Sequence, residues 1–182
     1  MYRVLIALLL ASCATPGSGV HEMTAAGHDA AASKETQAGA TGPAAAHQGA
    51  ADELRRQETE ACAGLTKAER ETSPLAKASV VAVKQLKWDA GEVGPEIVGA
   101  SVVVRGDPNV SHGQLQRLFT CYIANEQLAG ATTTSEDPLA VPGISVTVRP
   151  YGPGFAVDIM APGPGSSASE LWRRASHLGP TR

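Results

Sequence analysis

Apolar positions recur at two spacings in the chain after residue 50, and these spacings predict both helices and strands. Between residues 111 and 128 they follow the i, i+3, i+4, i+7 rule of an amphipathic helix, and Ser111 supplies an N-cap. The apolar residues of this helix are Leu115, Leu118, Phe119 and Tyr122. Two further helices are expected at the ends of this region. One begins near Ala51, and the other opens at the sequence Ser167-Ala168-Ser169-Glu170, which has the form of a capping box.

Alternating apolar and polar residues predict four strands, over 80–88, 97–105, 144–149 and 155–159. The last two flank a loop rich in proline and glycine, which favours a hairpin. The predicted order is an N-terminal helix followed by two strand-strand-helix units. We therefore expect an α+β fold, with a four-stranded antiparallel sheet and its helices on one face, over residues 51–182.

The first fifty residues have a different character. One cation, Arg3, precedes an apolar run from Val4 to Ala11, which is typical of a secretory signal peptide over residues 1–12. The end of this run together with the two residues after it, Leu10-Ala11-Ser12-Cys13, resembles the lipobox of bacterial lipoprotein precursors. That resemblance implies that Cys13 carries a diacylglyceryl group and becomes the first residue of the mature chain.

The alternative is an ordinary secretion signal that is cut elsewhere, for instance after Ala14. With lipidation, two or three acyl chains such as palmitate would hold the chain firmly to a membrane, since one chain alone binds only marginally. Ala14 is not the aspartate associated with inner-membrane retention. In a Gram-negative cell we therefore expect the outer membrane, with the protein facing the periplasm.

Residues 14–50 contain twelve alanines and six glycines, and they predict a disordered tether between the lipidated Cys13 and the domain. The tract holds His21, Met23, His28 and His47, whose imidazole and thioether groups suit copper or nickel. Solvated linker residues are the alternative, and the one we favour, because a flexible tract does not preorganise ligands.

Two cysteines remain, Cys62 and Cys121, and an even pair in an exported domain predicts a disulfide. Buried free thiols are the alternative. Motifs around both cysteines, together with Phe155-Ala156-Val157 and Glu170-Leu171-Trp172, resemble an uncharacterised family of proteobacterial envelope proteins. That pattern has histidine where this chain has Tyr122, and Cys-Pro-Leu where this chain has Asp137-Pro138-Leu139, so a Cys-His metal or redox site is not expected.

Composition narrows the function further. The net charge of -3, from 15 basic and 18 acidic residues, disfavours nucleic acid as a partner. The sequence shows no nucleophile elbow, zinc-protease helix, phosphate-binding loop or dinucleotide fingerprint. We therefore predict a non-enzymatic binding or structural module without a cofactor, attached to the membrane and in contact with an unknown envelope protein. Metal binding through the tether is the second hypothesis, and an enzyme is the third.

Overall fold

The computed structural model describes residues 23–89, 91, 94–130 and 135–179. Five α-helices, one 3₁₀ turn and four strands make up these parts of the chain, and they form an α+β fold as predicted. The predicted signal peptide, Cys13 and His21 lie outside the described residues. Among the described residues, no helix combines the length and the apolar character that crossing a membrane requires.

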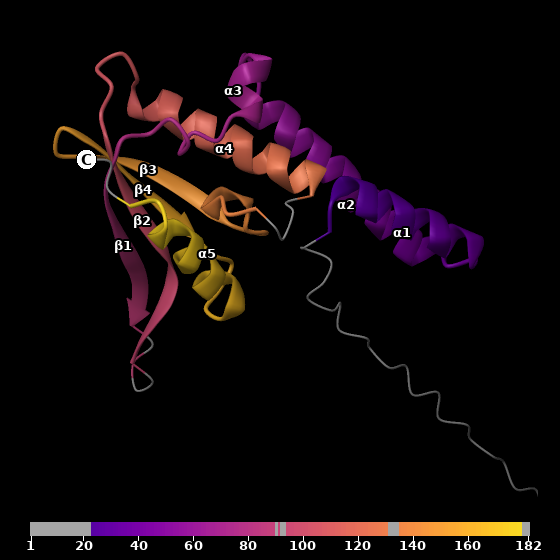
Figure 1. The fold of residues 1–182 in the computed structure, drawn as a ribbon. Helices are drawn as coiled ribbons and strands as arrows, with labels where there is room; N and C mark the ends of the chain where they lie inside the picture. Colours follow the sequence, from indigo (N-terminus) through magenta and orange to yellow (C-terminus); the bar gives the residue numbers. More distant parts are fainter. Residues whose placement is uncertain (1–22, 90, 92–93, 131–134, 180–182) are drawn as a thin grey trace, which may run out of the picture.

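The sheet is four-stranded and antiparallel throughout, in the order β1-β2-β4-β3. The strands are β1 (Val80–Asp89), β2 (Pro95–Arg105), β3 (Ser145–Tyr151) and β4 (Gly154–Met160). The two hairpins lie side by side because β2 pairs with β4 in the centre. Strands β1 and β3 are therefore the two edges, and the β1–β2 hairpin projects past the helices (Figure 1).

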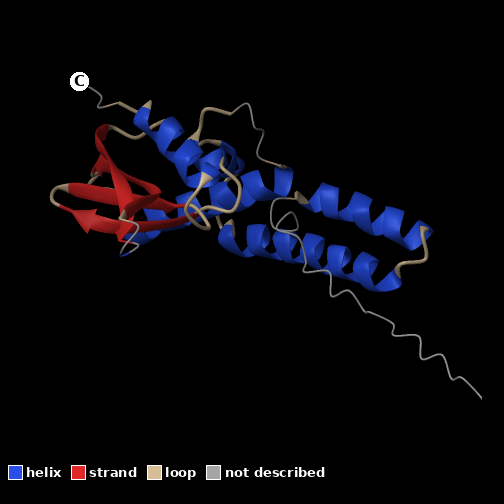
Figure 2. Cartoon of the chain, turned by 90° about the horizontal axis from the view of Figure 1, so that it is seen from below, coloured by secondary structure: helices blue, strands red, loops and turns tan. Residues whose placement is uncertain are grey.

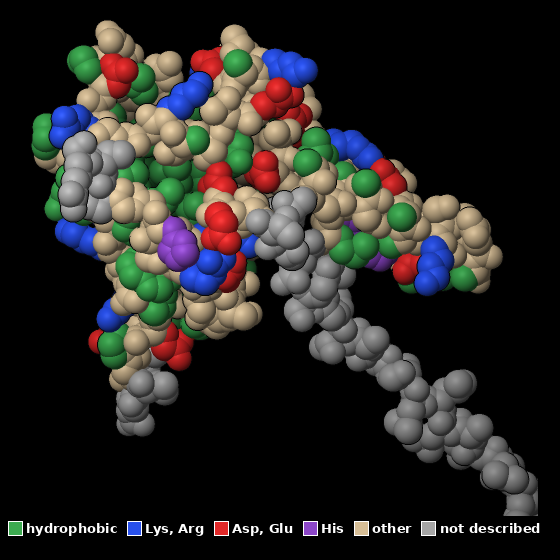
Figure 3. All heavy atoms as spheres, viewed as in Figure 1, with side chains coloured by type: hydrophobic (Ala, Val, Ile, Leu, Met, Phe, Trp, Pro, Cys, Tyr) green, Lys and Arg blue, Asp and Glu red, His purple; other side chains and the backbone are tan. Residues whose placement is uncertain are grey.

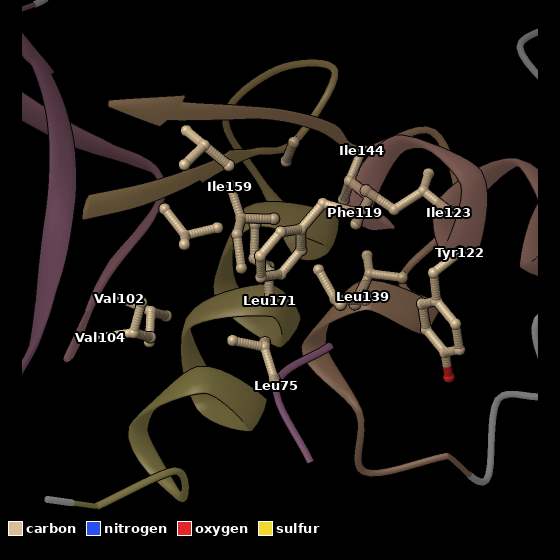
Figure 4. Close-up of a cluster of buried hydrophobic side chains, with 14 of the residues drawn as sticks. Leu75, Val102, Val104, Phe119, Tyr122, Ile123, Leu139, Ile144, Ile159 and Leu171 are labelled. Atoms are coloured by element: carbon tan, nitrogen blue, oxygen red, sulfur yellow. The ribbon is translucent and has the colours of Figure 1, made fainter. Parts of the chain in front are cut away.

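Helices α4 (His112–Ala129) and α5 (Ser166–Ser176) cover one face of this sheet. Their side chains Phe119 and Leu171 are fully buried and meet the central valines and isoleucine of β2 and β4 (Figure 4). The strand residues of this core include Val102, Val104, Val148, Val157 and Ile159. The 3₁₀ turn η3 (Pro138–Ala140) closes the core with Leu139, which is 1% exposed.

The start of α4 is as predicted, because the Ser111 hydroxyl accepts a hydrogen bond from the Gln114 amide. The expected capping box of α5 is wrong. That helix begins at Ser166 after Gly165, and no side chain caps it. Ser167 therefore lies inside the first turn, and Glu170 instead binds Arg173 and Arg174 further along the helix.

The expectation of a disordered tether is wrong for residues 25–50. Helix α1 (Ala25–Gln37) and helix α2 (Thr41–Ala61) form an antiparallel hairpin, with Gly39 at φ +76° in the turn between them (Figure 2). The predicted boundary at residue 51 falls inside α2. The short helix α3 (Lys67–Glu71) then leads into the sheet, and it carries a complete capping box between Thr66 and Glu69.

Alanine explains why this tract folds. It has the best helix propensity, and its small side chain lets two helices approach closely. The buried alanines of the hairpin are Ala25, Ala32, Ala44 and Ala51. Gly42 and Pro43 do not stop α2 because they lie in its first turn, where the backbone N–H groups have no partner within the helix.

Candidate functional site

The hairpin is joined covalently to the domain. Cys62 is the C-cap residue of α2, Cys121 lies in the middle of α4, and a disulfide connects them across a Cα–Cα distance of 4.7 Å. Both residues are fully buried. The pairing predicted from the sequence is the one that the structure forms, and it leaves no thiol of this pair available for chemistry.

The structure brings two of the three tether histidines together. His28 of α1 and His47 of α2 face each other with their Nδ1 atoms 2.9 Å apart, and His28 is only 2% exposed. Glu35, two turns along α1 from His28, places a carboxylate oxygen 3.6 Å from Nε2 of His47. Met23 lies beside Gly27, before the first turn of α1. The reading of His28 and His47 as solvated linker residues is therefore wrong.

Sequence reasoning missed Glu35 as a member of this group. The signal was present, because residues 28 and 35 are seven apart and share one face of a helix. It could be used only once residues 25–37 were recognised as helical. Among the described residues, no group of three or more His, Cys, Asp and Glu side chains is close enough to enclose a metal ion.

The two positions at which the chain departs from the envelope-family pattern are in contact. The Tyr122 hydroxyl donates a hydrogen bond of 3.1 Å to Oδ2 of Asp137, whose Oδ1 accepts one from the Leu139 amide. Burial raises the pKa of Tyr122 well above its usual range, and the negative charge of Asp137 adds to this. The pair is thus a neutral phenol bound to a carboxylate that also caps η3, which is a structural role.

The nearby Glu126 also titrates abnormally. Burial raises the pKa of its carboxyl above the ordinary value, and the charge of Asp137 raises it further. Arg174 of α5, only 4% exposed, donates to the Asp137 carbonyl oxygen and to Glu170. Together these contacts bind α4, η3 and α5 to one another at the end of the core.

The sheet face opposite the core carries a polar network. Ser101 donates a hydrogen bond of 2.5 Å to Asp158, and Arg149 pairs with the other carboxylate oxygen at 2.7 Å. Lys84 and Arg149 both lie within 6 Å of the centre of the Tyr151 ring, at 5.7 and 5.8 Å. The Asp158 carboxylate of β4 is thus held between Ser101 of β2 and Arg149 of β3, which joins three neighbouring strands on this face.

A shallow hollow of about 570 Å³ opens between α2, α4 and the start of β3. Its polar lining residues are Gln57, Glu60, Thr120, Gln127 and Ser145. Glu60 is the titratable group among them, and it is paired with Arg56 at 2.6 Å. Its walls offer hydrogen bonds and apolar contact, but they place no acid and base opposite each other.

The two edges of the sheet differ. Gln116 of α4 donates to the Val146 carbonyl oxygen at 3.0 Å and accepts from the Val148 amide at 2.6 Å, so its side chain takes the place of a neighbouring strand along β3. Strand β1 instead exposes large apolar side chains, with Val81 49% and Trp88 60% accessible. On the face drawn in Figure 3, acidic and basic side chains are intermixed.

No family model, curated protein or solved structure matches the chain. Membership of the envelope family therefore stays a prediction.

Proposed function

We propose that this protein is a lipid-anchored component of the bacterial cell envelope, held in the outer membrane through Cys13 and facing the periplasm. Its folded part binds or supports another envelope component and is not an enzyme. The proposed export and lipid anchoring rest on the apolar run after Arg3 and on the residues Leu10-Ala11-Ser12-Cys13.

The single observation that carries this proposal furthest is the buried Cys62–Cys121 disulfide. Disulfides form and persist in oxidising compartments such as the periplasm and are rare in the cytosol. A domain whose folded state contains one is therefore suited to export, which agrees with the leader pattern.

Strand β1 is the surface we assign to partner binding. An extended segment of a partner can add to an exposed strand edge, where main-chain hydrogen bonds give affinity and side-chain contacts give specificity. The β3 edge is closed by Gln116, whereas β1 presents Val81 and Trp88 to solvent. An unpaired strand edge is otherwise a liability for aggregation, which a bound partner removes.

Incorporation of labelled palmitate into the full chain in a Gram-negative host tests the anchor. We expect label in the wild type and none in Cys13→Ala, while a double variant of Cys62 and Cys121 to alanine remains labelled. Label that persists in Cys13→Ala, or a wild type without label, would contradict the proposal.

Capture from crosslinked envelopes tests the β1 edge. We expect species captured by the wild type to be lost from a Val81→Lys, Trp88→Lys variant. They should persist with Met160→Lys, because Met160 is a comparably exposed apolar residue, 44% accessible, on the inner strand β4. The opposite pattern would assign binding to the other side of the sheet.

A further inference from the structure

Three polar side chains lie between the buried alanines of the α1–α2 hairpin. His28 and Glu35 lie on one face of α1, and His47 faces both of them from α2. The ring of His47 is therefore held between an imidazole on its Nδ1 side, at 2.9 Å, and a carboxylate on its Nε2 side, at 3.6 Å. The His28 and His47 rings are tilted by 44°, with their centroids 5.1 Å apart.

The proton between the two rings decides what His47 presents to Glu35. A contact of 2.9 Å between two imidazole nitrogens requires one hydrogen between them. When His47 donates that hydrogen to His28, the Nε2 atom of His47 keeps a free lone pair directed at the carboxylate. Two electron-rich atoms then face each other, and a cation between them relieves the repulsion.

The separation of these atoms fits a shared metal ion. A distance of 3.6 Å is longer than a normal N–H···O hydrogen bond. An ion about 2.0–2.1 Å from each atom, at an angle near 120°, separates its two ligands by about 3.6 Å. The second carboxylate oxygen of Glu35, Oε2, is buried and has no hydrogen-bond partner, so a carboxylate that binds through both oxygens would satisfy it.

We propose that His47 Nε2 and the Glu35 carboxylate form an open site for a divalent transition-metal ion that accepts imidazole and carboxylate ligands, such as zinc, copper or nickel. His28 is a positioning residue that accepts the Nδ1 hydrogen of His47. A metal-bound histidine commonly donates the hydrogen of its other ring nitrogen to a neighbouring group, which holds the ring in place. The ligand side chains are 17% and 30% exposed, so water reaches the ion and completes its coordination.

This inference is independent of the lipid anchor and of the β1 edge. The sequence offered four candidate ligands in a flexible tract. The folded hairpin instead supplies two ligands, His47 and Glu35, and one positioning residue, His28. Binding orders no new segment, because the three side chains already face one another.

Calorimetric titration of the full chain in detergent, purified without a histidine tag, tests the site with Cu(II), Ni(II) and Zn(II) salts. We expect one ion per chain, with binding weakened at least about tenfold in both His47→Ala and Glu35→Gln, and about 10- to 100-fold in His28→Ala. His112→Ala is the matched control, because this histidine is exposed at the start of α4, and it should bind as the wild type does.

Two readouts separate ligation from a loss of structure. The helical circular dichroism of Glu35→Gln should equal that of the wild type, since the amide replaces the carboxylate without a change of shape. The paramagnetic resonance spectrum of the Cu(II) complex should show coupling to one imidazole. Wild-type affinity in His47→Ala and Glu35→Gln, or no binding by the wild type, would overturn the site. Coupling to two imidazoles would overturn the role given to His28.

Discussion

The helical hairpin and the sheet domain stabilise themselves in different ways. The domain buries large aliphatic and aromatic side chains, among them Phe119, Leu139 and Leu171. The α1–α2 hairpin buries mainly alanines and, between them, the His28–His47 pair. Since the free energy of burial grows with the apolar area removed from water, the hairpin gains much less per residue than the domain.

This difference shows what the disulfide does. The C-cap of α2 is the point at which the weakly packed hairpin meets the strongly packed α4, and the Cys62–Cys121 bond lies there. A covalent link at this junction keeps the hairpin in register with the domain even when its own packing opens.

The largest effect is therefore expected from removal of this link. A Cys62→Ser, Cys121→Ser double variant should lower the free energy of unfolding by about 4 kcal/mol, from the chain-entropy cost of a loop with a sequence separation of 59. Urea denaturation followed by circular dichroism measures this. Reduction of the wild type should produce the same loss, and an unchanged midpoint in both cases would contradict the account.

A second prediction tests whether the two regions open separately. Ala51 is fully buried on α2, and Ala51→Leu should overpack the hairpin at a cost of about 2 kcal/mol. Hydrogen exchange should then speed up for the amides of α1 and leave those of β2 and β4 unchanged. Ala46→Leu, at an exposed position of the same helix, is the control. Equal loss of protection in the sheet would show one cooperative unit.

The edges of the sheet give a third, smaller effect. Gln116→Ala removes both hydrogen bonds to β3 and leaves the Val148 amide without its partner, which should cost about 1–2 kcal/mol. It should also make the protein associate at high concentration, which light scattering would detect, because β3 becomes an open edge. Gln114→Ala, on the exposed side of the same helix, should do neither.

The smallest effect concerns Glu126 at the end of the domain core. Burial and then Asp137 raise the pKa of its carboxyl, so the folded chain holds this proton more tightly than the unfolded chain. The associated stability is present below the ordinary pKa of 4.5 and is lost as the pH rises above it. Glu126→Gln should therefore raise the melting temperature at pH 7 and have no effect near pH 4. A variant that melts below the wild type at pH 7 would contradict this.

The sequence predicted the domain well because its periodicity is strong and local. The helix that Ser111 caps, the four strands and the cysteine pair all correspond to elements of the structure. The two hairpins were predicted, but the pairing of β2 with β4 and the closing of β3 by Gln116 were not, because both depend on residues far apart along the chain.

The hairpin was missed for a physical reason. An amphipathic helix is recognised in a sequence by large apolar residues on one face. Between residues 25 and 50 alanine takes their place, so the buried face does not differ clearly in hydrophobicity from the exposed face. Gly42 and Pro43 disfavour the interior of a helix, although the first turn of α2 accepts them. Without the hairpin, the approach of His28, Glu35 and His47 could not be predicted.

We propose that the chain is exported and anchored at Cys13, and that its domain carries the Cys62–Cys121 disulfide. Intact mass spectrometry of the protein extracted from its native membranes, with and without alkylation of thiols, tests it most directly. We predict a chain that begins at Cys13, carries the added mass of diacylglycerol and a further acyl group, and takes up no alkylating reagent before reduction. An unmodified chain, or one in which Cys62 and Cys121 are alkylated without reduction, would contradict the account.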